Sequence, residues 1–391
     1  MPEAVIVSAV RTAIGTARKG SLTETPAEVL ATHILREAID RSGVPGDRVD
    51  DVMFAEAMYG GGDLARYAAV DAGLTHVPGQ AVNRHCASSL TTIGNAAANI
   101  RAGMDRVVVA GGVQSTSLAP TSTWRVPGTQ DQFEDRIAPT FPYSDGVTDD
   151  VTLSVGWNVA QEVGISREEM DAWAVRSHHR AAAATEAGKF LDEIAPIKVT
   201  TKDGSTIDFA VDEHPRATSS LEKVATLKPL HPEIEGFSIT AGNASGMNDA
   251  AAAVTIVGDD VAAELGLTPL ATVRAWSAVG VEPRVTGLGA IEAAKKVLDR
   301  AGLQAADIDL WEINEAFASV PVAACKVLDL DEEKVNIYGS GCSLGHPVAA
   351  SGTRMIVTLV HELRRRGGGL GLATMCAGGG QGGAVIIEVA G

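Results

Sequence analysis

One cysteine of the chain stands where a protein could make its sulfur nucleophilic. Residues 83–90 read NRHCASSL, so Cys86 lies between a strand-like segment and a run of small residues typical of a helix start. The N-terminus of a helix favours thiolate over thiol, which makes a cysteine placed there reactive. We interpret Cys86 as a candidate nucleophile. Taken by itself, the segment leaves open that Cys86 is a buried and inert cysteine.

A histidine later in the chain could take the proton of such a thiol. His346 lies in the sequence GHP at residues 345–347, after a glycine- and serine-rich loop at 339–343 and before a strong helix. Cysteine nucleophiles are commonly activated by an imidazole base of this kind. The alternative is an ordinary turn histidine beside a proline.

In two further segments, a predicted strand ends at residues that could act on a substrate. Cys376 closes an apolar strand and precedes glycines at 378–380, whose N–H groups are free to point at a reacting oxygen. Its other interpretation is a core cysteine at a strand end. Asn314 opens the sequence NEAF at 314–317, where a strand gives way to a helix, and this segment predicts no chemistry by itself.

The elements that must hold these residues alternate between β-branched runs and helical stretches in both halves of the chain, which indicates an α/β protein. We predict strands at residues 5–10, 49–57, 106–110, 271–279 and 309–313, with two more closing the chain. We predict helices at residues 26–39, 87–101, 166–187, 290–300 and 347–365. A capping box at Thr25 opens the first helix, and one from Ser166 to Glu169 opens the third.

The second half of the chain repeats the pattern of the first. Val-Asn pairs at 82–83 and 335–336 each precede a loop, a helix and an apolar strand that runs into glycines. Residues 118–243 differ, with scattered prolines and aromatic residues, and an insertion this long is more often functional than idle. We interpret it as a lid or binding excursion. The predicted domains are a first half at 1–117 plus 244–268, an inserted loop domain at 118–243, and a second half at 269–391.

Composition narrows the class of protein. The 391 residues carry a formal net charge of −17, so a nucleic-acid surface would work against the field of the whole molecule. The four cysteines lack CxxC pairing, which predicts neither a disulfide framework nor a zinc site. The chain has no secretory signal pattern and no apolar run of membrane-spanning length. We expect a cytoplasmic protein without a membrane span, a nucleic-acid partner or a bound metal.

Together, these segments resemble the thiolase family over essentially the whole chain. The resemblance rests on the cysteine loop ending at residue 89, NEAF at 314–317, GHP at 345–347, Cys376 with its glycines, and AGNASGMND at 241–249. It implies the thiolase fold, with two similar α/β halves layered as αβαβα and an inserted loop domain. It also implies an acetyl-CoA C-acyltransferase or C-acetyltransferase that cleaves 3-ketoacyl-CoA with CoA, or runs the reverse condensation. CoA thioesters are then substrates, no cofactor is bound permanently, and a homodimer or homotetramer is expected.

The resemblance also implies a role for each matching residue. Cys86 would carry the acyl group, His346 would activate it, and Cys376 would shuttle protons as general acid and base. Asn314 would hold a water that forms one oxyanion hole with the histidine. The second hole would use backbone N–H groups at Cys86 and Gly378.

Two more residues would meet the coenzyme. Ser245 lies in the segment that contacts pantetheine, and Arg216 aligns with a position near the CoA nucleotide.

Three stretches depart from the common thiolase pattern. Thr152 and Thr286 stand where members resembling this chain often place methionines beside the acyl group, and Leu153 replaces a glycine. The stretch at 338–342 replaces the frequent Asn-Gly-Gly run before the histidine. The smaller threonines predict a pocket for 3-ketoacyl chains longer or bulkier than acetoacetyl, which Leu153 could refill.

Two other functions fit parts of this pattern. A ketosynthase-like condensing enzyme acting on acyl carrier protein would share the fold, but such enzymes generally lack a second catalytic cysteine, so Cys376 favours a thiolase. A non-catalytic acyl-CoA or sterol carrier needs none of Cys86, His346 and Cys376.

Overall fold

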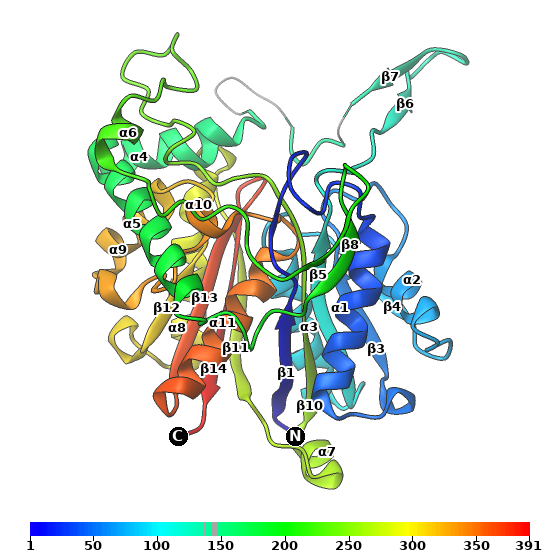
Figure 1. The fold of residues 1–391 in the computed structure, drawn as a ribbon. Coiled ribbons are helices and arrows are strands. Elements are labelled where there is room, and N and C mark those ends of the chain that lie inside the picture. The colour runs from blue at the N-terminus through cyan, green and yellow to red at the C-terminus, as the bar shows by residue number, and fades with distance from the viewer. Residues whose placement is uncertain (137, 143–147) are drawn as a thin grey trace.

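A long, mixed β-sheet runs through the molecule (Figure 1). The structure is a computed structural model that describes residues 1–136, 138–142 and 148–391. The first part of the sheet has the order β1-β10-β5-β3-β4. Its strands are β1 (Ala4–Arg11), β3 (Asp51–Ala55), β4 (Gly79–Val82), β5 (Val107–Gln114) and β10 (Asn248–Gly258). The short strand β2 (Gly15–Thr16) also pairs with β10.

The second part of the sheet repeats the order of the first as β11-β14-β13-β12. Its strands are β11 (Ala271–Gly280), β12 (Leu310–Ile313), β13 (Gly369–Ala377) and β14 (Gln381–Val389). In both parts the first two pairings are antiparallel and the third is parallel. This correspondence confirms the prediction of two similar halves.

The two halves of the sheet meet at a short antiparallel junction between β1 and β11. Only two residue pairs form it, Val5 with Thr272 and Ile6 with Ala271. The other pairings within each half are longer, so most of the contact between the halves comes from the helices between them.

Helices form layers on both sides of the strands and between the halves. α1 (Ala27–Ser42) and α2 (Leu64–Asp71) cover the outer face of the first half, and α8 (Gly289–Ala301) with α9 (Ser319–Leu328) covers that of the second. α3 (Ser88–Ala102) and α11 (Ser351–Arg366) pack against each other and contact strands of both halves. The layers therefore follow the order αβαβα, as predicted.

The side-chain pattern of β1 explains why this strand can lie between two helix layers. Val5, Val7 and Val10 belong to the outer core with α1, whereas Ile6 belongs to the central core with α3 and α11. Successive side chains of a strand point to opposite faces, and both faces of this strand are covered. The whole strand from Ala4 to Arg11 is accordingly buried.

Residues 118–243 form several smaller elements that pack on both halves. Their list is β6 (Thr123–Arg125), β7 (Phe133–Asp135), η2 (Thr152–Trp157), α4 (Asn158–Val163), α5 (Arg167–Glu186), β8 (Ile197–Thr200), β9 (Thr206–Phe209) and α6 (Leu221–Ala225). The β6–β7 hairpin extends away from the body of the molecule (Figure 1). Residues 137 and 143–147 of the predicted insert lie outside the described residues. The division of the chain at 117, 243 and 268 stays a prediction.

The short remaining elements join these parts. They are η1 (Gly46–Arg48), α7 (Asp259–Leu265), η3 (Pro283–Leu288), η4 (Ala305–Asp307), η5 (Glu332–Lys334) and α10 (Gly341–Leu344). In the part of the chain that the structure describes, no helix combines the length and apolarity needed to cross a bilayer.

The two predicted helix caps have different outcomes. Ser166 accepts a hydrogen bond from the Glu169 N–H, and the Glu169 carboxylate accepts one from the Ser166 N–H, so the capping box of α5 is confirmed. At α1 the prediction of a box at Thr25 is wrong, because Pro26 occupies the cap position and no side chain caps the helix. Proline has a fixed φ that suits a helix start without such a bond.

Candidate active site

Cys86 lies in the loop that leads from β4 into α3. The backbone of the preceding residue, His85, is left-handed, with φ 46°. The His85 carbonyl accepts hydrogen bonds from the Ser88 hydroxyl at 2.5 Å and from the Ser88 N–H at 3.1 Å. No side chain caps the start of α3, and its first N–H group, that of Ser88, is taken up by the His85 carbonyl.

The thiol of Cys86 is protonated when the site is at rest. Burial raises its pKa to about 11, although the backbone N–H groups of Gly378 and of Cys86 itself act in the opposite direction by favouring the thiolate. A sulfur with this pKa needs a base before it can attack a substrate at neutral pH. The two N–H groups show that backbone donors approach the sulfur directly.

Cys376 is the last residue but one of β13 in the other half, and it lies close enough to Cys86 for the charge of one thiol to influence the other. Burial raises its pKa well above the usual range, and a charge on Cys86 would raise it further. Cys376 is 1% exposed. The site therefore holds two neighbouring neutral thiols, one from each half of the molecule.

Gly378 belongs to the glycine turn between β13 and β14. Gly379 and Gly380 have left-handed backbones, with φ 79° and 75°, which residues with a side chain adopt only at a cost. The Gly380 N–H donates to the Thr286 hydroxyl at 3.0 Å, and Gln381 Nε2 donates to the Gly378 carbonyl at 3.0 Å. The Gly378 N–H lies close enough to the sulfur of Cys86 to favour its thiolate.

His346 is buried in the loop between α10 and α11. Its N–H approaches Asn248 Oδ1 at 3.0 Å, and its Nδ1 lies 2.6 Å from the Ser351 hydroxyl. The Ser351 hydroxyl also donates to the Pro347 carbonyl at 3.0 Å. Since that hydroxyl has one proton to give, we assign the proton of the imidazole to Nδ1, which leaves Nε2 as the free base.

The surroundings of His346 keep its imidazole neutral. Burial, and then the charge of Arg354, lower its pKa to about 4. A neutral imidazole can accept a proton at neutral pH. No hydrogen bond joins Cys86 to His346 in the structure, but the helices that follow them pack together, with the Thr353 N–H of α11 donating to the Ser89 hydroxyl of α3 at 3.0 Å.

Asn314 follows β12 and lies against the imidazole. Its Nδ2 is 3.5 Å from His346 Nδ1 and 3.4 Å from Nε2. Its Oδ1 is buried and has no hydrogen-bond partner among the described residues. A buried amide oxygen without a partner costs roughly 1–3 kcal/mol. The position can therefore take a hydrogen-bond donor, such as a water or a substrate group.

The two residues predicted to meet a coenzyme lie in neighbouring segments away from Cys86. The Ser245 N–H donates to the Ala316 carbonyl at 2.9 Å, which joins its segment to the residues after Asn314. Arg216 is exposed, and its guanidinium forms no ion pair with a described residue. His214 connects the two segments, because its ring would lie 2.5 Å from a Cβ added at Gly246.

Sequence reasoning missed several residues that support the site. Glu315 is completely buried and accepts four hydrogen bonds, from Trp173, Ser177, Asn336 and the Cys342 N–H. Its only sequence signal is its place directly after Asn314. Asn248, Ser351 and His85 had no assigned role, although Asn248 and His85 lie within the segments that carry the resemblance.

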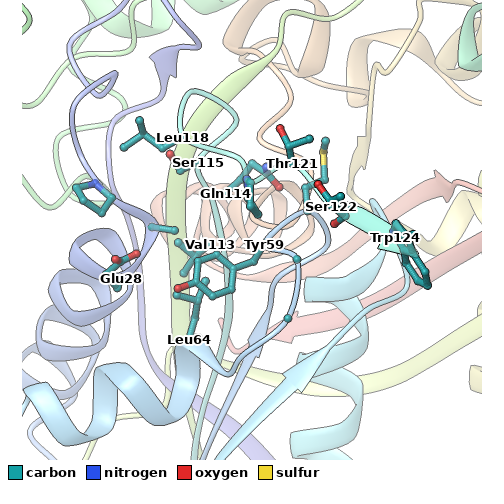
Figure 2. Close-up of a pocket in the computed structure, with 17 residues that line it drawn as sticks. Glu28, Tyr59, Leu64, Val113, Gln114, Ser115, Leu118, Thr121, Ser122 and Trp124 are labelled. Carbon is teal, nitrogen blue, oxygen red and sulfur yellow. The ribbon is translucent and has the colours of Figure 1, made fainter. Parts of the chain in front are cut away.

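A large cavity lies elsewhere. It has a volume of about 890 Å³ and is lined by Glu28, Tyr59, Gln114, Leu118 and Trp124 among others (Figure 2). None of Cys86, His346 or Cys376 lines it. The described residues contain no group of three or more His, Cys, Asp or Glu side chains placed to hold a metal ion.

Comparison with known proteins gives the same family for both halves. The family model described as "Thiolase, N-terminal domain" matches residues 4–260, and "Thiolase, C-terminal domain" matches residues 267–389. An acetyl-CoA acetyltransferase of Escherichia coli is 42% identical over 99% of both chains. One of Cupriavidus necator is 40% identical over 99% of this chain and 100% of its own length.

Solved structures agree with the fold. The acetyl-CoA acetyltransferase of Bacillus anthracis matches with a TM-score of 0.91 and 40% identity, and human mitochondrial 3-ketoacyl-CoA thiolase with 0.90 and 36%. Each match covers 100% of this chain and 99% of the other. The thiolase interpretation is thereby confirmed over the ketosynthase and carrier alternatives. With both family models matched and relatives aligned over nearly its whole length, the chain belongs to the thiolase family and is an acyltransferase.

Proposed function

We propose that the protein cleaves 3-ketoacyl-CoA with CoA, and runs the reverse condensation, through an acyl thioester on Cys86. One observation carries this proposal: two thiols from opposite halves lie close enough to influence each other's charge, and the Gly378 N–H lies close enough to the sulfur of one of them to favour its thiolate. A nucleophile with a backbone donor needs only a base and a second acid–base group to complete acyl transfer. The neutral His346 and Cys376 supply those groups.

In the first half-reaction the Cys86 sulfur attacks the 3-keto carbon. The Cys86 proton passes to Nε2 of His346, and the oxygen of the tetrahedral adduct takes hydrogen bonds from the N–H groups of Cys86 and Gly378. The bond between C2 and C3 then breaks, which leaves the acyl group on sulfur and an enolate of acetyl-CoA. Cys376 gives its proton to C2 of this enolate and becomes a thiolate.

In the second half-reaction the Cys376 thiolate takes the proton of the CoA thiol. The CoA sulfur attacks the acyl carbon on Cys86, and the Cys86 sulfur leaves and recovers its proton from His346. The acyl-CoA product forms and every group returns to its first state. Removing one backbone donor from such an oxyanion hole typically costs about 3–4 kcal/mol of barrier.

Asn314 is proposed to serve the enolate oxygen of the leaving acetyl group. Its unpartnered Oδ1 and the contact of its Nδ2 with the imidazole support a bound water between the amide and the substrate. Ser245 and Arg216 are proposed to hold the pantetheine and nucleotide ends of CoA. The unpaired charge of Arg216 suits a phosphate. CoA enters as a substrate, and no permanently bound cofactor is proposed.

Peptide mass spectrometry after incubation with acetyl-CoA tests the nucleophile. We expect an acetyl mass on the peptide that carries Cys86 and none in the Cys86→Ala variant. Cys325 and Cys342 provide internal controls, because both are buried free thiols in the same chain. An adduct found only on one of these two cysteines contradicts the assignment.

The substrate is proposed to be a 3-ketoacyl-CoA longer or bulkier than acetoacetyl-CoA. Thr152 donates its hydroxyl to Asp150 at 2.6 Å, and Thr286 donates to the Pro283 carbonyl at 2.8 Å. Both polar atoms are thus satisfied locally, and both side chains are shorter than methionine. Each additional buried methylene contributes about 0.8 kcal/mol to binding.

Thiolysis kinetics with four-carbon and ten-carbon substrates decide the chain length. The ten-carbon substrate is expected to have the higher kcat/KM. A higher value for acetoacetyl-CoA would refute the larger pocket while leaving the thiolase reaction intact.

We further propose a homo-oligomer in the cytoplasm. Trp124 and Phe133 are 38% and 62% exposed on the projecting hairpin, and the cavity of Figure 2 opens beside it. Exposed aromatic residues around a hollow are typical of association surfaces. Light scattering on the purified protein should give the mass of a dimer or tetramer. The Trp124→Glu variant should shift that mass downward if the hairpin takes part.

A further inference from the structure

His85 adopts a backbone conformation that histidine rarely takes. Its φ of 46° lies in the left-handed region, which costs on the order of 1 kcal/mol for a residue with a side chain. Neighbouring side chains hold it there: Asn83 Oδ1 accepts from the His85 N–H at 2.9 Å, and the Ser88 hydroxyl donates to the His85 carbonyl at 2.5 Å. Strain that the surroundings maintain in this way concentrates at functional sites.

The held carbonyl belongs to the same peptide unit as the Cys86 N–H. A peptide unit is planar and trans, so its carbonyl and its N–H point in opposite directions. When Ser88 fixes the His85 carbonyl, it also fixes the direction of the Cys86 N–H. That N–H is one of the two backbone donors at the Cys86 sulfur. The backbone of His85 therefore sets the direction of the first donor, the Cys86 N–H.

The side chain of His85 reaches the second donor. A Cβ added at Gly378 would lie 3.3 Å from the Cγ of His85 and 3.5 Å from its Nδ1, so the imidazole rests on Gly378. The Nε2 of His85 lies 3.2 Å from the Thr140 hydroxyl, and the Thr140 methyl group fills the space beside Gly379. Among the described residues, burial is the only influence on the pKa of the His85 ring, and it lowers that pKa, so the imidazole is neutral. A neutral ring packed on a glycine limits how far that glycine can move.

We propose that His85 is a positioning residue for the oxyanion hole at Cys86: its left-handed backbone aims the Cys86 N–H, and its ring holds the Gly378 N–H on the same sulfur. This inference rests on the proposed function. It assigns His85 no contact with the substrate and no proton transfer.

Three variants separate the two contributions. His85→Asn keeps a residue that tolerates the left-handed region but removes the ring. His85→Phe keeps an aromatic ring on Gly378 but is disfavoured in that backbone conformation. His85→Ala loses both properties. His76→Ala is a matched control, because His76 is exposed and lies outside the site.

We expect kcat to fall about tenfold in His85→Asn and His85→Phe and about a hundredfold in His85→Ala, since a fully lost donor costs 10²–10³ in kcat. KM for CoA should stay within twofold, because the coenzyme-binding segments are untouched. The alkylation of Cys86 by iodoacetamide should need a higher pH in all three variants, because its thiolate loses aligned donors. His76→Ala should match the wild type in all these measurements.

Other outcomes would overturn the proposal. If His85→Asn and His85→Phe both abolish turnover and remove the same limb of the pH–rate profile, the ring transfers protons and does not position the hole. If kcat of all variants stays within twofold of wild type, His85 has no role. These outcomes differ from a failure of the proposed function. The proposed function fails if mass spectrometry of the wild type finds the acetyl group on a residue other than Cys86. Should His85→Ala not fold, the other two variants still decide the question.

Discussion

In the proposed reaction, Cys86 and Cys376 divide between them two tasks that need opposite properties of sulfur. A nucleophile must lose its proton readily, whereas an acid that protonates an enolate must keep its proton until the carbon needs it. The pKa of Cys86 is raised to about 11 by burial but opposed by two backbone donors, and that of Cys376 is raised further with no donor from another residue. In the proposed reaction the same residue type thus acts as nucleophile at one position and as acid at the other, because the backbone around it differs.

Cys376→Ser should separate acylation from turnover. We expect kcat to fall at least a thousandfold, because a serine hydroxyl is far too weak an acid to protonate the enolate or to relay the CoA proton. Acetylation of Cys86 by acetyl-CoA should remain detectable by mass, since His346 and the Gly378 N–H are unchanged. Stopped-flow acylation and steady-state turnover on the same sample measure the two quantities. Turnover near that of the wild type would show that another group moves these protons.

At the scale of elements, Glu315 joins three parts of the chain behind the site. Its carboxylate accepts from Trp173 at 2.8 Å and Ser177 at 2.6 Å on α5, from Asn336 at 2.8 Å, and from the Cys342 N–H of α10 at 3.0 Å. Glu315 directly follows Asn314 in the chain. A movement of α5 or α10 would therefore shift Asn314 through the peptide bond between these two residues. A completely buried carboxylate of this kind is stable only while all its donors are present.

Glu315→Gln is expected to lower both stability and activity. The glutamine amide would place an N–H₂ group where one carboxylate oxygen accepts hydrogen bonds now. At least one buried donor would then lose its acceptor, at a cost of about 1–3 kcal/mol. The melting temperature should drop by several degrees, and kcat should fall as Asn314 loses its support. Glu332→Gln is the control, since Glu332 in η5 is half exposed and pairs with Arg176, which lies on α5 as Trp173 and Ser177 do. Equal melting temperatures for the two variants would contradict the role of Glu315.

The elements that sequence predicts well are those whose signals are local. The capping box at Ser166, the buried valines and isoleucines of β1, and the helices before and after the glycine loops all follow from neighbouring residues. β10 was missed because its sequence NDAAAAVTIVG opens with asparagine, aspartate and four alanines, which have little preference for strands. Burial between β1 and β5 makes it a strand. The helix predicted from residue 347 begins at Ser351, since residues 347–350 form the turn that positions His346.

The candidate site divides in the same way. The residue types of Cys86, His346 and Cys376 and their places at element ends indicated chemistry from the sequence alone. The supports of these residues could not be predicted, because Asn248 and Glu315 act through contacts with segments distant in the chain, and Ser351 acts through one nitrogen of the His346 ring. The junction of the two halves into one sheet could not be predicted from the sequence either, because a contact of two residue pairs leaves no periodic pattern.

Across the whole molecule, burial of imidazoles links stability to pH. His178, His214 and His346 each have a pKa lowered to about 4, with burial as the main cause. Between pH 6.5 and 4 these histidines therefore bind protons in the unfolded chain but stay neutral in the folded chain. The free energy of unfolding falls as pH drops through this window. Each histidine contributes up to about 3 kcal/mol. Glu312 and Asp51 act in the opposite direction, because their pKa values are raised to about 7 and about 6.

We expect the three histidines to outweigh the two carboxyl groups, so the melting temperature should fall steadily from pH 6.5 to pH 4.5. His178→Gln should make this fall shallower, since one of the imidazoles that resist protonation is gone. His76→Gln should leave the slope unchanged, because His76 is exposed. Calorimetry at half-unit pH steps measures all three slopes. A wild-type melting temperature that is flat or rises toward pH 4.5 would contradict the assignment.

The matching strand orders of the two halves bear on how such a site can arise. The loop before α3 carries Cys86, and the loop before α11, its counterpart in the second half, carries His346. An assembly of two identical half-length chains would place the same residue at both positions, giving two cysteines or two histidines but never a nucleophile with its base. Joining the halves in one gene frees each position to change alone. The division of labour at this site is therefore a property of the fused chain, available to no symmetric ancestor built from one half.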